Sequence, residues 1–296
     1  MALVTVITPT YNRGENLKTL FQSLKDQTSK NFEWLIVDDG SVDNTREVVK
    51  EFLDHPSFEV RYIHKENGGK HTALNLGIQT ISSELTFIVD SDDSVFPDGV
   101  ETIERYYSKY KNVENLGALS FLRWNTRQGI MVKTPKDESV GSYVKERIKE
   151  NRPGDMAEVF VTNVLKEFPF PEFEGERFLS EDVVWIPLGM KYKYVFVNKP
   201  IYQFEYLQDG LTRNDKHHKF ASPLGSMMRG KMLMKRECGI RANLRGAIIY
   251  GCYRKDVLGK LPAGVELEGA WDMMLVFFMT PASIWFHRKW KNQAKR

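Results

Sequence analysis

Cysteine is scarce in this chain of 296 residues, where Cys238 and Cys252 are the only two. They match no metal-ligand spacing and lack the density of a disulfide scaffold, which favours a reducing compartment. A long apolar stretch is also missing, because the run 271–286 has 16 residues and includes Asp272 and Pro281, whereas a membrane span needs about 20. The N-terminal residues lack the regions of a signal peptide. We therefore expect a globular chain without a leader or a membrane span.

Charge is divided unevenly along the chain. Residues 201–296 contain 17 Lys and Arg against 8 Asp and Glu, while residues 1–200 contain 25 against 31. A basic C-terminal part suits nucleic acid, a phosphorylated substrate or an anionic membrane surface, or it is simply a solvated face. The sequence has no internal repeat and no low-complexity tract, so its length fits one large domain or one domain with a C-terminal extension.

The first 95 residues alternate between apolar runs and segments with helical spacing. Strands are predicted at 3–8, 34–37, 59–64 and 85–89, and helices at 14–26, 43–53 and 71–81. Such alternation predicts a parallel sheet with helices on both faces. Ligands bind beyond the carboxyl ends of the strands in sheets of this kind.

The rest of the chain is less regular. We expect a helix over 97–110, a strand over 117–124, a helix over 178–190 and a strand over 194–206 with a break at Pro200. Residues 127–176 are rich in Lys, Glu and Pro and are predicted as loops and short helices around an acceptor. From residue 224 onward the pattern is helical and basic.

Three polar clusters lie at the predicted strand ends: residues 9–12, residues 38–39 and residues 90–93. In the last cluster Asp90, Asp92 and Asp93 place three carboxylates in four residues, which repel one another if left bare. A divalent Mn²⁺ or Mg²⁺ ion would relieve that repulsion, because it accepts carboxylate and phosphate oxygens together. The alternative is a solvated acidic turn before the helix near Pro97.

Five segments resemble, in order, the motifs of family 2 glycosyltransferases. They are VITPTYNR (6–13), WLIVDDGSVDNT (34–45), NGGKHTALNLGI (67–78), FIVDSDD (87–93) and SEDVVW (180–185). The resemblance covers roughly the first two-thirds of the chain. It implies an α/β protein with the GT-A fold, a mostly parallel nucleotide-binding sheet flanked by helices, and a basic helical C-terminal extension. The implied domains are a catalytic domain over 1–220, with a nucleotide-sugar half at 1–95 and an acceptor half at 96–220, and the extension over 221–296.

The resemblance also assigns residues to the nucleotide. Pro9, Thr10 and Tyr11 match positions that line the base pocket. Asp39 matches the acidic residue that accepts a hydrogen bond from uracil, and this match favours a UDP-sugar as donor. Asp38 is the neighbouring candidate, with the role of a turn residue at the strand end as its alternative.

Further matches concern the diphosphate and the metal. Lys70 and Asn75 match positions near the nucleotide, where Lys70 would add positive charge beside the diphosphate. Asp92 is the favoured direct ligand of Mn²⁺ or Mg²⁺, and Asp90 would contact the ribose or the metal. Asp93 could replace either, because the acidic run allows two alignments.

Glu181 and Asp182 match the pair that carries the catalytic base. Inversion needs a base that deprotonates the acceptor hydroxyl, and Asp182 fits that role while Glu181 orients the acceptor. The alternative is an acidic N-terminal turn of the following helix. No QxxRW run, which processive members of the family carry, follows Asp182, and this indicates transfer of a single sugar.

The region 211–219 lies where related enzymes often have a loop over the diphosphate. Arg213 could clamp phosphate there, and His217 or His218 could join the metal ligands; paired exposed histidines are the alternative. His71 has no role that the resemblance transfers, and we expect it on a helix surface.

The apolar run 271–286 and the basic segment 287–296 are typical of a helix that lies on an anionic membrane surface. Packing on the catalytic domain and a homo-oligomer contact are the alternatives. Family members that extend lipid-linked oligosaccharides act at that surface. We therefore expect a bacterial enzyme of polysaccharide or capsule biosynthesis with a lipid-linked carbohydrate acceptor. It would act in the cytoplasm at the inner face of the membrane, and nucleic acid is not an expected partner. A soluble or protein acceptor, and a catalytically silent nucleotide-sugar-binding scaffold, are the competing hypotheses.

Overall fold

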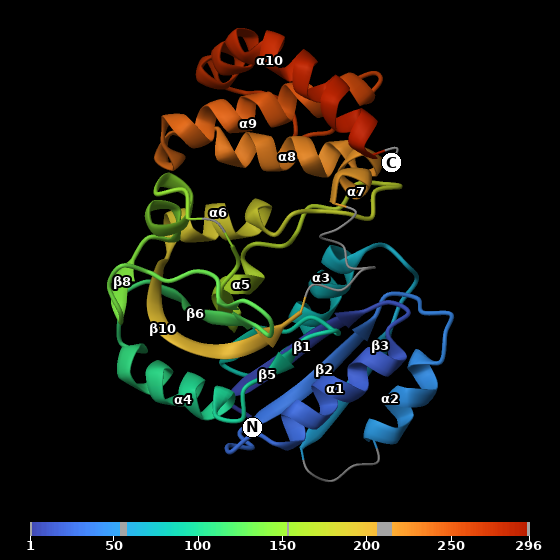
Figure 1. Cartoon of the computed structure of the whole chain (residues 1–296), viewed down its shortest axis with the longest axis vertical. Helices are drawn as coiled ribbons and strands as arrows, with labels where there is room; N and C mark the ends of the chain where they lie inside the picture. Colours follow the sequence, from blue (N-terminus) through green and yellow to red (C-terminus); the bar gives the residue numbers. More distant parts are fainter. Residues whose placement is uncertain (1, 54–57, 153, 206–214, 295–296) are drawn as a thin grey trace. The chain divides into compact units, whose positions relative to one another are not determined.

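The computed structural model describes residues 2–53, 58–152, 154–205 and 215–294 (Figure 1). The chain divides into two units. Unit 1 draws on residues 1–142, 153–169 and 191–205, and unit 2 on residues 143–152, 170–190 and 206–296. Each is considered by itself. This division differs from the predicted boundary at residue 220, because residues 143–152 and 170–190 group with the C-terminal helices. The boundaries of the functional domains stay a prediction.

The first half of unit 1 has the predicted alternation of strands and helices. Its elements are β1 (Val4–Thr10), α1 (Gly14–Lys25), β2 (Phe32–Asp38), α2 (Thr45–Leu53), β3 (Glu59–His64), α3 (Lys70–Thr80) and β4 (Leu85–Ile88). The four strands are parallel, in the order β3-β2-β1-β4. Every residue of β1 and β2 is buried, as expected for strands that helices cover on both sides.

Helices cover both faces of these parallel strands, as predicted. On one face Trp34 of β2 packs with Phe21 of α1 and Phe52 of α2, the two phenylalanine rings being stacked with their centroids 4.2 Å apart. On the other face Gly77 of α3 lies so close to Ile7 and Val37 that a Cβ there would stand 2.6 and 2.8 Å from their side chains. Helix α3 therefore approaches the sheet as closely as a glycine permits.

Among the residues that the structure describes, the second half of unit 1 extends the sheet to ten strands in mixed orientation. Its elements are β5 (Ser94–Val95), α4 (Gly99–Tyr110), β6 (Leu116–Asn125), β7 (Gly129–Ile130), β8 (Ser139–Gly141), β9 (Ala157–Val161), α5 (Thr162–Lys166) and β10 (Lys193–Phe204). Strand β10 is parallel to β6 and continues through Pro200, where the sequence predicted a break; what occurs there is a shift of its register against β6 on both sides of Pro200.

Strand β9 is the main error of the sequence prediction, which placed loops and short helices over 127–176. It lies inside the sheet, antiparallel to both β4 and β6. Val159 and Phe160 are fully buried. The strand has only five residues, and Glu158 interrupts its apolar pattern. Such a short segment shows too little of the alternation of a strand to be recognised from its own sequence.

Unit 2 is helical, which confirms the predicted character of the C-terminal part. Its helices are the π-helical turn η1 (Val144–Lys149), α6 (Asp182–Lys191), α7 (Asp215–Ala221), α8 (Pro223–Leu233), the short turns η2 (Arg236–Cys238) and η3 (Arg254–Asp256), α9 (Ile240–Tyr253) and α10 (Ala270–Ala294). Helix α6 begins four residues later than predicted.

Helices α8 and α9 cross at two glycines. A Cβ on Gly230 would lie 2.8 Å from the carbonyl oxygen of Gly246, and a Cβ on Gly246 would lie 2.5 Å from that of Gly230. Helix α10 packs on α9 through Gly251, where a Cβ would lie 2.6 Å from Ser283 Oγ. Within the described residues, none of the helices combines the length and apolar character that a membrane crossing requires.

Candidate functional site

The loops that follow β1, β2 and β4 form what we call the carboxyl edge of unit 1. The first two loops are joined directly, because the Asp39 N–H donates to the Thr10 carbonyl oxygen at 2.8 Å. Asn12, with φ 51°, receives the Val42 N–H on its side-chain oxygen and donates its own N–H to Ser41 Oγ, both at 2.8 Å. Asparagine tolerates this left-handed conformation better than most residues.

The three residues predicted to line a base pocket lie at this edge. Pro9 and Thr10 end β1 and are buried, while the side chain of Tyr11 is 44% exposed. The Thr10 hydroxyl is buried without a hydrogen-bond partner among the described residues. The Tyr11 ring is therefore the member of this group that a base can reach.

Asp38 makes the contacts of a turn residue. One carboxylate oxygen accepts the Ser41 N–H at 2.8 Å, and the other accepts the Tyr62 hydroxyl at 2.6 Å. Burial and this hydrogen bond raise the pKa of Tyr62. Asp38 is fully buried and Asp39 is 3% exposed; the contacts of Asp38 are those of a strand-end turn residue, and its nucleotide role stays a prediction.

Asp39 holds the loop before α3. Its carboxylate accepts hydrogen bonds from Lys65 Nζ at 2.8 Å, the Gly68 N–H at 2.9 Å and the Gly69 N–H at 2.7 Å. Lys65 also donates to Thr72 Oγ1 at 2.8 Å. A carboxylate has about four acceptor positions, so Asp39 retains capacity for one more donor. Sequence reasoning missed Lys65, since nothing local marks it as the partner of a carboxylate 26 residues earlier.

Lys70 and Asp90 form the closest ion pair of the edge, with Lys70 Nζ 2.6 Å from Asp90 Oδ1. Burial opposes the charge on Asp90, but Lys70 and Arg123 outweigh it and hold its pKa below the usual range. Asp92 stands 3.8 Å from a guanidinium nitrogen of Arg13. Burial and the charge of Asp90 raise the pKa of Asp92, which shows that the two carboxylates repel each other.

Asp93 belongs to a buried network. It accepts hydrogen bonds from the Tyr202 hydroxyl at 2.6 Å and from Arg123 Nη2 at 2.9 Å. The Asp90 N–H donates to the same Tyr202 oxygen at 3.0 Å, and Arg123 lies over the Tyr202 ring, 4.1 Å from its centroid. Burial and the charge of Asp90 raise the pKa of Asp93 to about 7. The network fixes the acidic loop to β6 and β10, and it uses Arg123 and Tyr202, which sequence reasoning missed.

The repulsion among the three carboxylates of the acidic run is therefore reduced by basic side chains of the same unit. Among the described residues no group of three or more His, Cys, Asp and Glu is arranged to hold a metal ion. Asp90 and Asp92 nevertheless suit an ion of the kind that binds one or two protein carboxylates and completes its ligands with substrate phosphates and water, as Mg²⁺ does. A metal can fit here as part of a complex with a diphosphate, and not as a site made by protein alone.

The predicted catalytic pair lies in unit 2, at the start of α6. The Glu181 carbonyl oxygen accepts the N–H groups of Val184 and Trp185 at 2.9 and 3.0 Å, so Glu181 occupies the N-cap position. Asp182 follows in the first turn, and its Oδ2 accepts Nε and Nη2 of Arg229 at 2.8 and 2.7 Å. A planar guanidinium fork fixes the orientation of a carboxylate. Arg229 lies 47 residues later, on α8, and no local pattern in the sequence predicts this pairing.

The histidines fall in different places. His71 is buried, which corrects the expected surface position, because it shares one face of α3 with the buried Leu74 and Ile78. His217 is exposed on α7, and His218 stacks on Phe178 with ring centroids 6.1 Å apart. Their predicted metal role remains a prediction.

Two other predicted contacts can be placed only in part. Asn75 is half-buried in the middle of α3, and its nucleotide contact stays a prediction. The predicted phosphate clamp, Arg213, lies outside the described residues.

Comparison with known proteins decides the family. The model of the glycosyl transferase family 2 domain matches residues 5–153, which is half of the chain and contains every residue of the carboxyl edge discussed above except Tyr202. The chain belongs to glycosyl transferase family 2. It is therefore an enzyme of the glycosyltransferase class, and the resemblance stated from its motifs is confirmed.

Two curated relatives come from Streptococcus pneumoniae. The transferase is 28% identical to the glycosyltransferase GlyA over 231 residues, which are 71% of this chain and 31% of GlyA. It is 28% identical to the glycosyltransferase GlyG over 225 residues, which are 72% of this chain and 74% of GlyG. The matched region is thus under a third of one relative and about three quarters of the other.

Solved structures confirm the GT-A fold of the transferase. S. aureus TarS 1-349 in complex with UDP-GlcNAc matches with a TM-score of 0.62 at 16% identity, over 86% of this chain and 72% of TarS 1-349. The mannosyltransferase PcManGT from Pyrobaculum calidifontis, in complex with GDP-Man and Mn²⁺, matches with a TM-score of 0.58 at 15% identity, over 99% of this chain and 83% of PcManGT. At these identities the likeness establishes the fold alone.

Proposed function

We propose that this transferase moves a single sugar from a UDP-sugar to a hydroxyl of a lipid-linked carbohydrate acceptor, with inversion at the sugar carbon and with Mn²⁺ or Mg²⁺ at Asp90 and Asp92. The observation that carries the proposal is the convergence of Asp39, Lys70, Asp90 and Asp92 at the carboxyl edge of parallel strands. This is the location at which open α/β sheets bind their ligands.

The choice of uridine rests on Asp39. Its three hydrogen bonds leave one acceptor position, and the imide N–H of uracil is a donor that fits it. The exposed ring of Tyr11 offers a surface on which a base can stack. TarS, which shares the fold, has been solved with UDP and with UDP-GlcNAc, whereas PcManGT binds GDP-Man, so guanosine is the alternative to test.

The diphosphate would lie beside Lys70 and the acidic loop. A bound Mn²⁺ or Mg²⁺ ion would neutralise the charge that develops on the leaving diphosphate. Asp92 and Asp90 would hold that ion, and Lys70 would then exchange its contact with Asp90 for one with a phosphate oxygen. Such an exchange costs little, because a carboxylate and a phosphate are similar partners for an ammonium group.

The base is assigned to unit 2. Asp182 would accept the proton of the acceptor hydroxyl as that oxygen attacks the sugar carbon, and the bond from this carbon to the diphosphate would break on the opposite face. The hydrogen bond from Arg229 Nε and the ion pair with Arg229 Nη2, both to Oδ2, orient the carboxylate. Glu181, at the N-cap beside it, would orient the acceptor.

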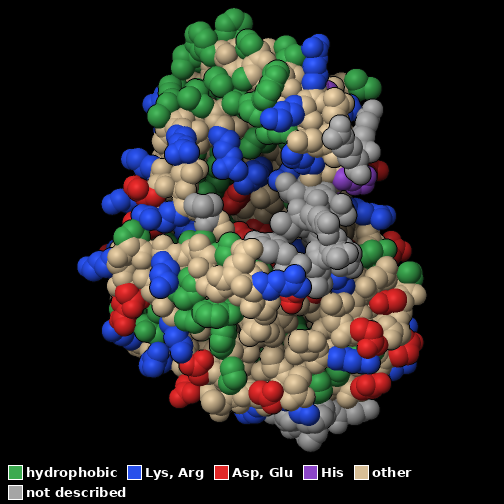
Figure 2. Space-filling model, viewed as in Figure 1, with side chains coloured by type: hydrophobic (Ala, Val, Ile, Leu, Met, Phe, Trp, Pro, Cys, Tyr) green, Lys and Arg blue, Asp and Glu red, His purple; other side chains and the backbone are tan. Residues whose placement is uncertain are grey.

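The lipid-linked acceptor is inferred from α10. Helix α10 buries only Leu275 and Ser283, and it exposes five large apolar side chains: Met273, Met274, Phe277, Phe278 and Trp285. Figure 2 shows hydrophobic side chains gathered over this helix. An apolar helix face beside a basic C-terminal segment suits the surface of an anionic membrane. On this proposal the reaction takes place at the cytoplasmic face of the membrane, in the synthesis of a surface polysaccharide.

Calorimetric titration of UDP into the whole chain tests the donor assignment, with and without Mn²⁺ and beside GDP. We expect UDP to bind in a metal-dependent manner and GDP to bind at least tenfold more weakly. Preference for GDP would overturn the uridine assignment, and equal binding with and without metal would overturn the role of Asp90 and Asp92. If neither nucleotide bound, the proposal of a nucleotide-sugar transferase would fail.

A further inference from the structure

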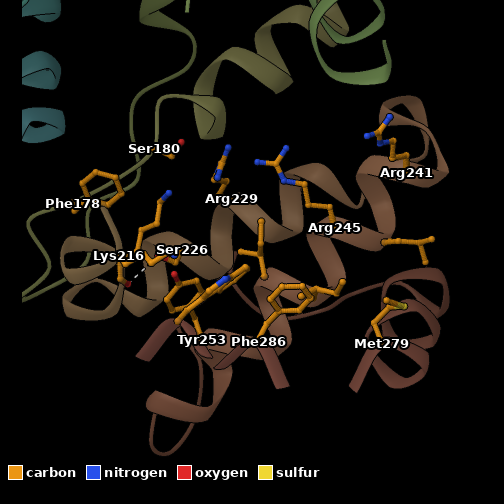
Figure 3. A pocket seen from close by; sticks show the side chains of 15 residues that line it. Phe178, Ser180, Lys216, Ser226, Arg229, Arg241, Arg245, Tyr253, Met279 and Phe286 are labelled. Atoms are coloured by element: carbon orange, nitrogen blue, oxygen red, sulfur yellow. Dashed lines mark hydrogen bonds between the residues drawn. The ribbon is translucent and has the colours of Figure 1, made fainter. Parts of the chain in front are cut away.

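Unit 2 contains a cavity of about 540 Å³, which lies among α7, α8, α9, α10 and the segment before α6. Its size is in the range of sites that bury a small organic ligand. Figure 3 shows Arg229, Arg241 and Arg245 toward one side of the cavity and Tyr253, Phe286 and Met279 toward the other. We call it the basic pocket.

Five cations line the basic pocket: Lys216, Lys219, Arg229, Arg241 and Arg245. No carboxylate is among its lining residues in the described part of the chain, and the nearby Asp182 offsets one charge through its pair with Arg229. Arg241 and Arg245 stand one turn apart on the same face of α9. Burial and the charge of Arg229 lower the pKa of Arg245, so these cations repel one another. The imbalance favours an anion with several oxygens, such as a phosphate or diphosphate.

Apolar side chains of α9 and α10 form a second part of the lining of the basic pocket. Leu244 and Ile248 come from the same face of α9 as the arginines, while Met279, Phe286 and Trp290 come from α10. An inorganic anion gains nothing from such a lining, because apolar surface stabilises only apolar groups. A neutral lipid, in turn, offers no negative charge to the cations. One ligand that uses both parts of the lining is an anion attached to a hydrocarbon chain.

We propose that the basic pocket binds a lipid phosphate, with the phosphate or diphosphate on Arg229, Arg241 and Arg245 and the first part of the chain against α9 and α10. The further assignment of this lipid phosphate to the acceptor rests on the proposed function. The binding of a lipid phosphate does not depend on it. Helix α10 presents Met279 and Phe286 to the pocket and Phe277 and Phe278 to the outside. The same helix can therefore contact a lipid chain on its inner face and a membrane on its outer face.

Binding of farnesyl diphosphate to the whole chain, measured by calorimetry below its micellar concentration, tests the proposal beside farnesol and inorganic diphosphate. We expect farnesyl diphosphate to bind at least tenfold more tightly than either part alone. Equal binding of inorganic diphosphate would mean an anion site only, and equal binding of farnesol an apolar cavity only; both results overturn the proposal, as does no binding.

Variants locate the binding. Arg245→Glu and Ile248→Asp should each weaken farnesyl diphosphate at least tenfold, since each places a negative charge in the pocket. Arg288→Glu makes the same change of charge on the exposed part of α10 and should leave affinity unchanged. An equal loss in Arg288→Glu would show a nonspecific effect of net charge and overturn the assignment, and so would full binding in both pocket variants.

UDP separates this proposal from the proposed function. A saturating concentration of UDP and Mn²⁺ should leave the affinity for farnesyl diphosphate unchanged, and competition would place the lipid phosphate at the donor site and overturn the proposal. Retained UDP binding in the pocket variants confirms that they fold. If UDP fails to bind the wild-type chain while farnesyl diphosphate binds, the proposed function fails and the lipid phosphate site stands.

Discussion

The carboxyl edge of unit 1 and the basic pocket of unit 2 hold their charges in opposite ways. At the edge each carboxylate of the acidic run has its own cation: Lys70 for Asp90, Arg13 for Asp92 and Arg123 for Asp93. In the pocket five cations line one cavity, no carboxylate is among the lining residues that the structure describes, and Asp182 pairs with Arg229. The edge therefore carries paired charges, whereas the lining of the pocket carries an excess of positive charge that an anion would offset.

This contrast explains why the two sites differ in how visible they are in the sequence. The edge consists of short motifs that follow predictable strands, and the register of parallel strands brings their ends together. The pocket consists of residues from four helices and the segment before α6. No local sequence motif predicts that these residues come together.

The largest effect is expected from Asp182, the proposed catalytic base, which also pairs with Arg229 of the basic pocket. Asp182→Asn should lower transfer by about a thousandfold, within the range that a general base contributes, and leave UDP affinity unchanged. Steady-state transfer assays with calorimetry of UDP measure both. Glu174→Gln, an exposed change in the same unit, is the matched control. Activity within a few fold of wild type would move the base elsewhere.

The next effect concerns the metal at the edge. Asp92→Ala should remove the Mn²⁺ dependence of UDP binding and weaken UDP by at least about tenfold, because the ion loses a ligand that joins it to the diphosphate. Titrations with and without Mn²⁺ test this, and Glu114→Ala, an exposed loop residue of the same unit, serves as control. Unaltered metal dependence would assign the ion to Asp90 or Asp93 instead.

A smaller effect is expected from the outer face of α10. Phe277→Asp, whose ring is 75% exposed, should reduce co-sedimentation with anionic vesicles about tenfold, since burial of a phenylalanine contributes about 1.5–3 kcal/mol. Leu258→Asp, at a side chain that is 93% exposed outside α10, should have no effect. Unchanged sedimentation with a shift to smaller assemblies in solution would make this face a contact between copies of the chain.

The last prediction concerns the stability of the fold rather than transfer or binding, and it is a pH dependence. With a folded pKa of about 7 against about 3.9 in an unfolded chain, Asp93 binds its proton more tightly when folded. Its contribution is fully present below about pH 4 and is lost as the pH rises through 7. Asp93→Asn should therefore flatten the fall in unfolding free energy between pH 4 and 7 by about 1 kcal/mol per pH unit. Urea unfolding of both proteins at several pH values measures the difference, and parallel curves would contradict a raised pKa.

Prediction from sequence succeeded where a residue's role depends on its neighbours in the chain. The alternation of strands and helices, the parallel orientation of the first four strands and an irregularity at Pro200 all follow from local patterns. It failed where a role depends on distant partners. Strand β9 is too short to be distinctive, His71 is buried because its helix face meets the sheet, and the partners Lys65, Arg123 and Arg229 lie 26 or more residues from the carboxylates that they hold.

The glycine crossing of α8 and α9 has a consequence for the pocket. Gly230 follows Arg229, and Gly246 follows Arg245, so the two positions where the backbones touch adjoin the two arginines that α8 and α9 contribute side by side (Figure 3). A methyl group at either glycine would push the helices apart and move one guanidinium group away from the other. The distance between these two positive charges is therefore set by two residues that have no side chain, because only glycine at both positions lets the helix backbones come into contact.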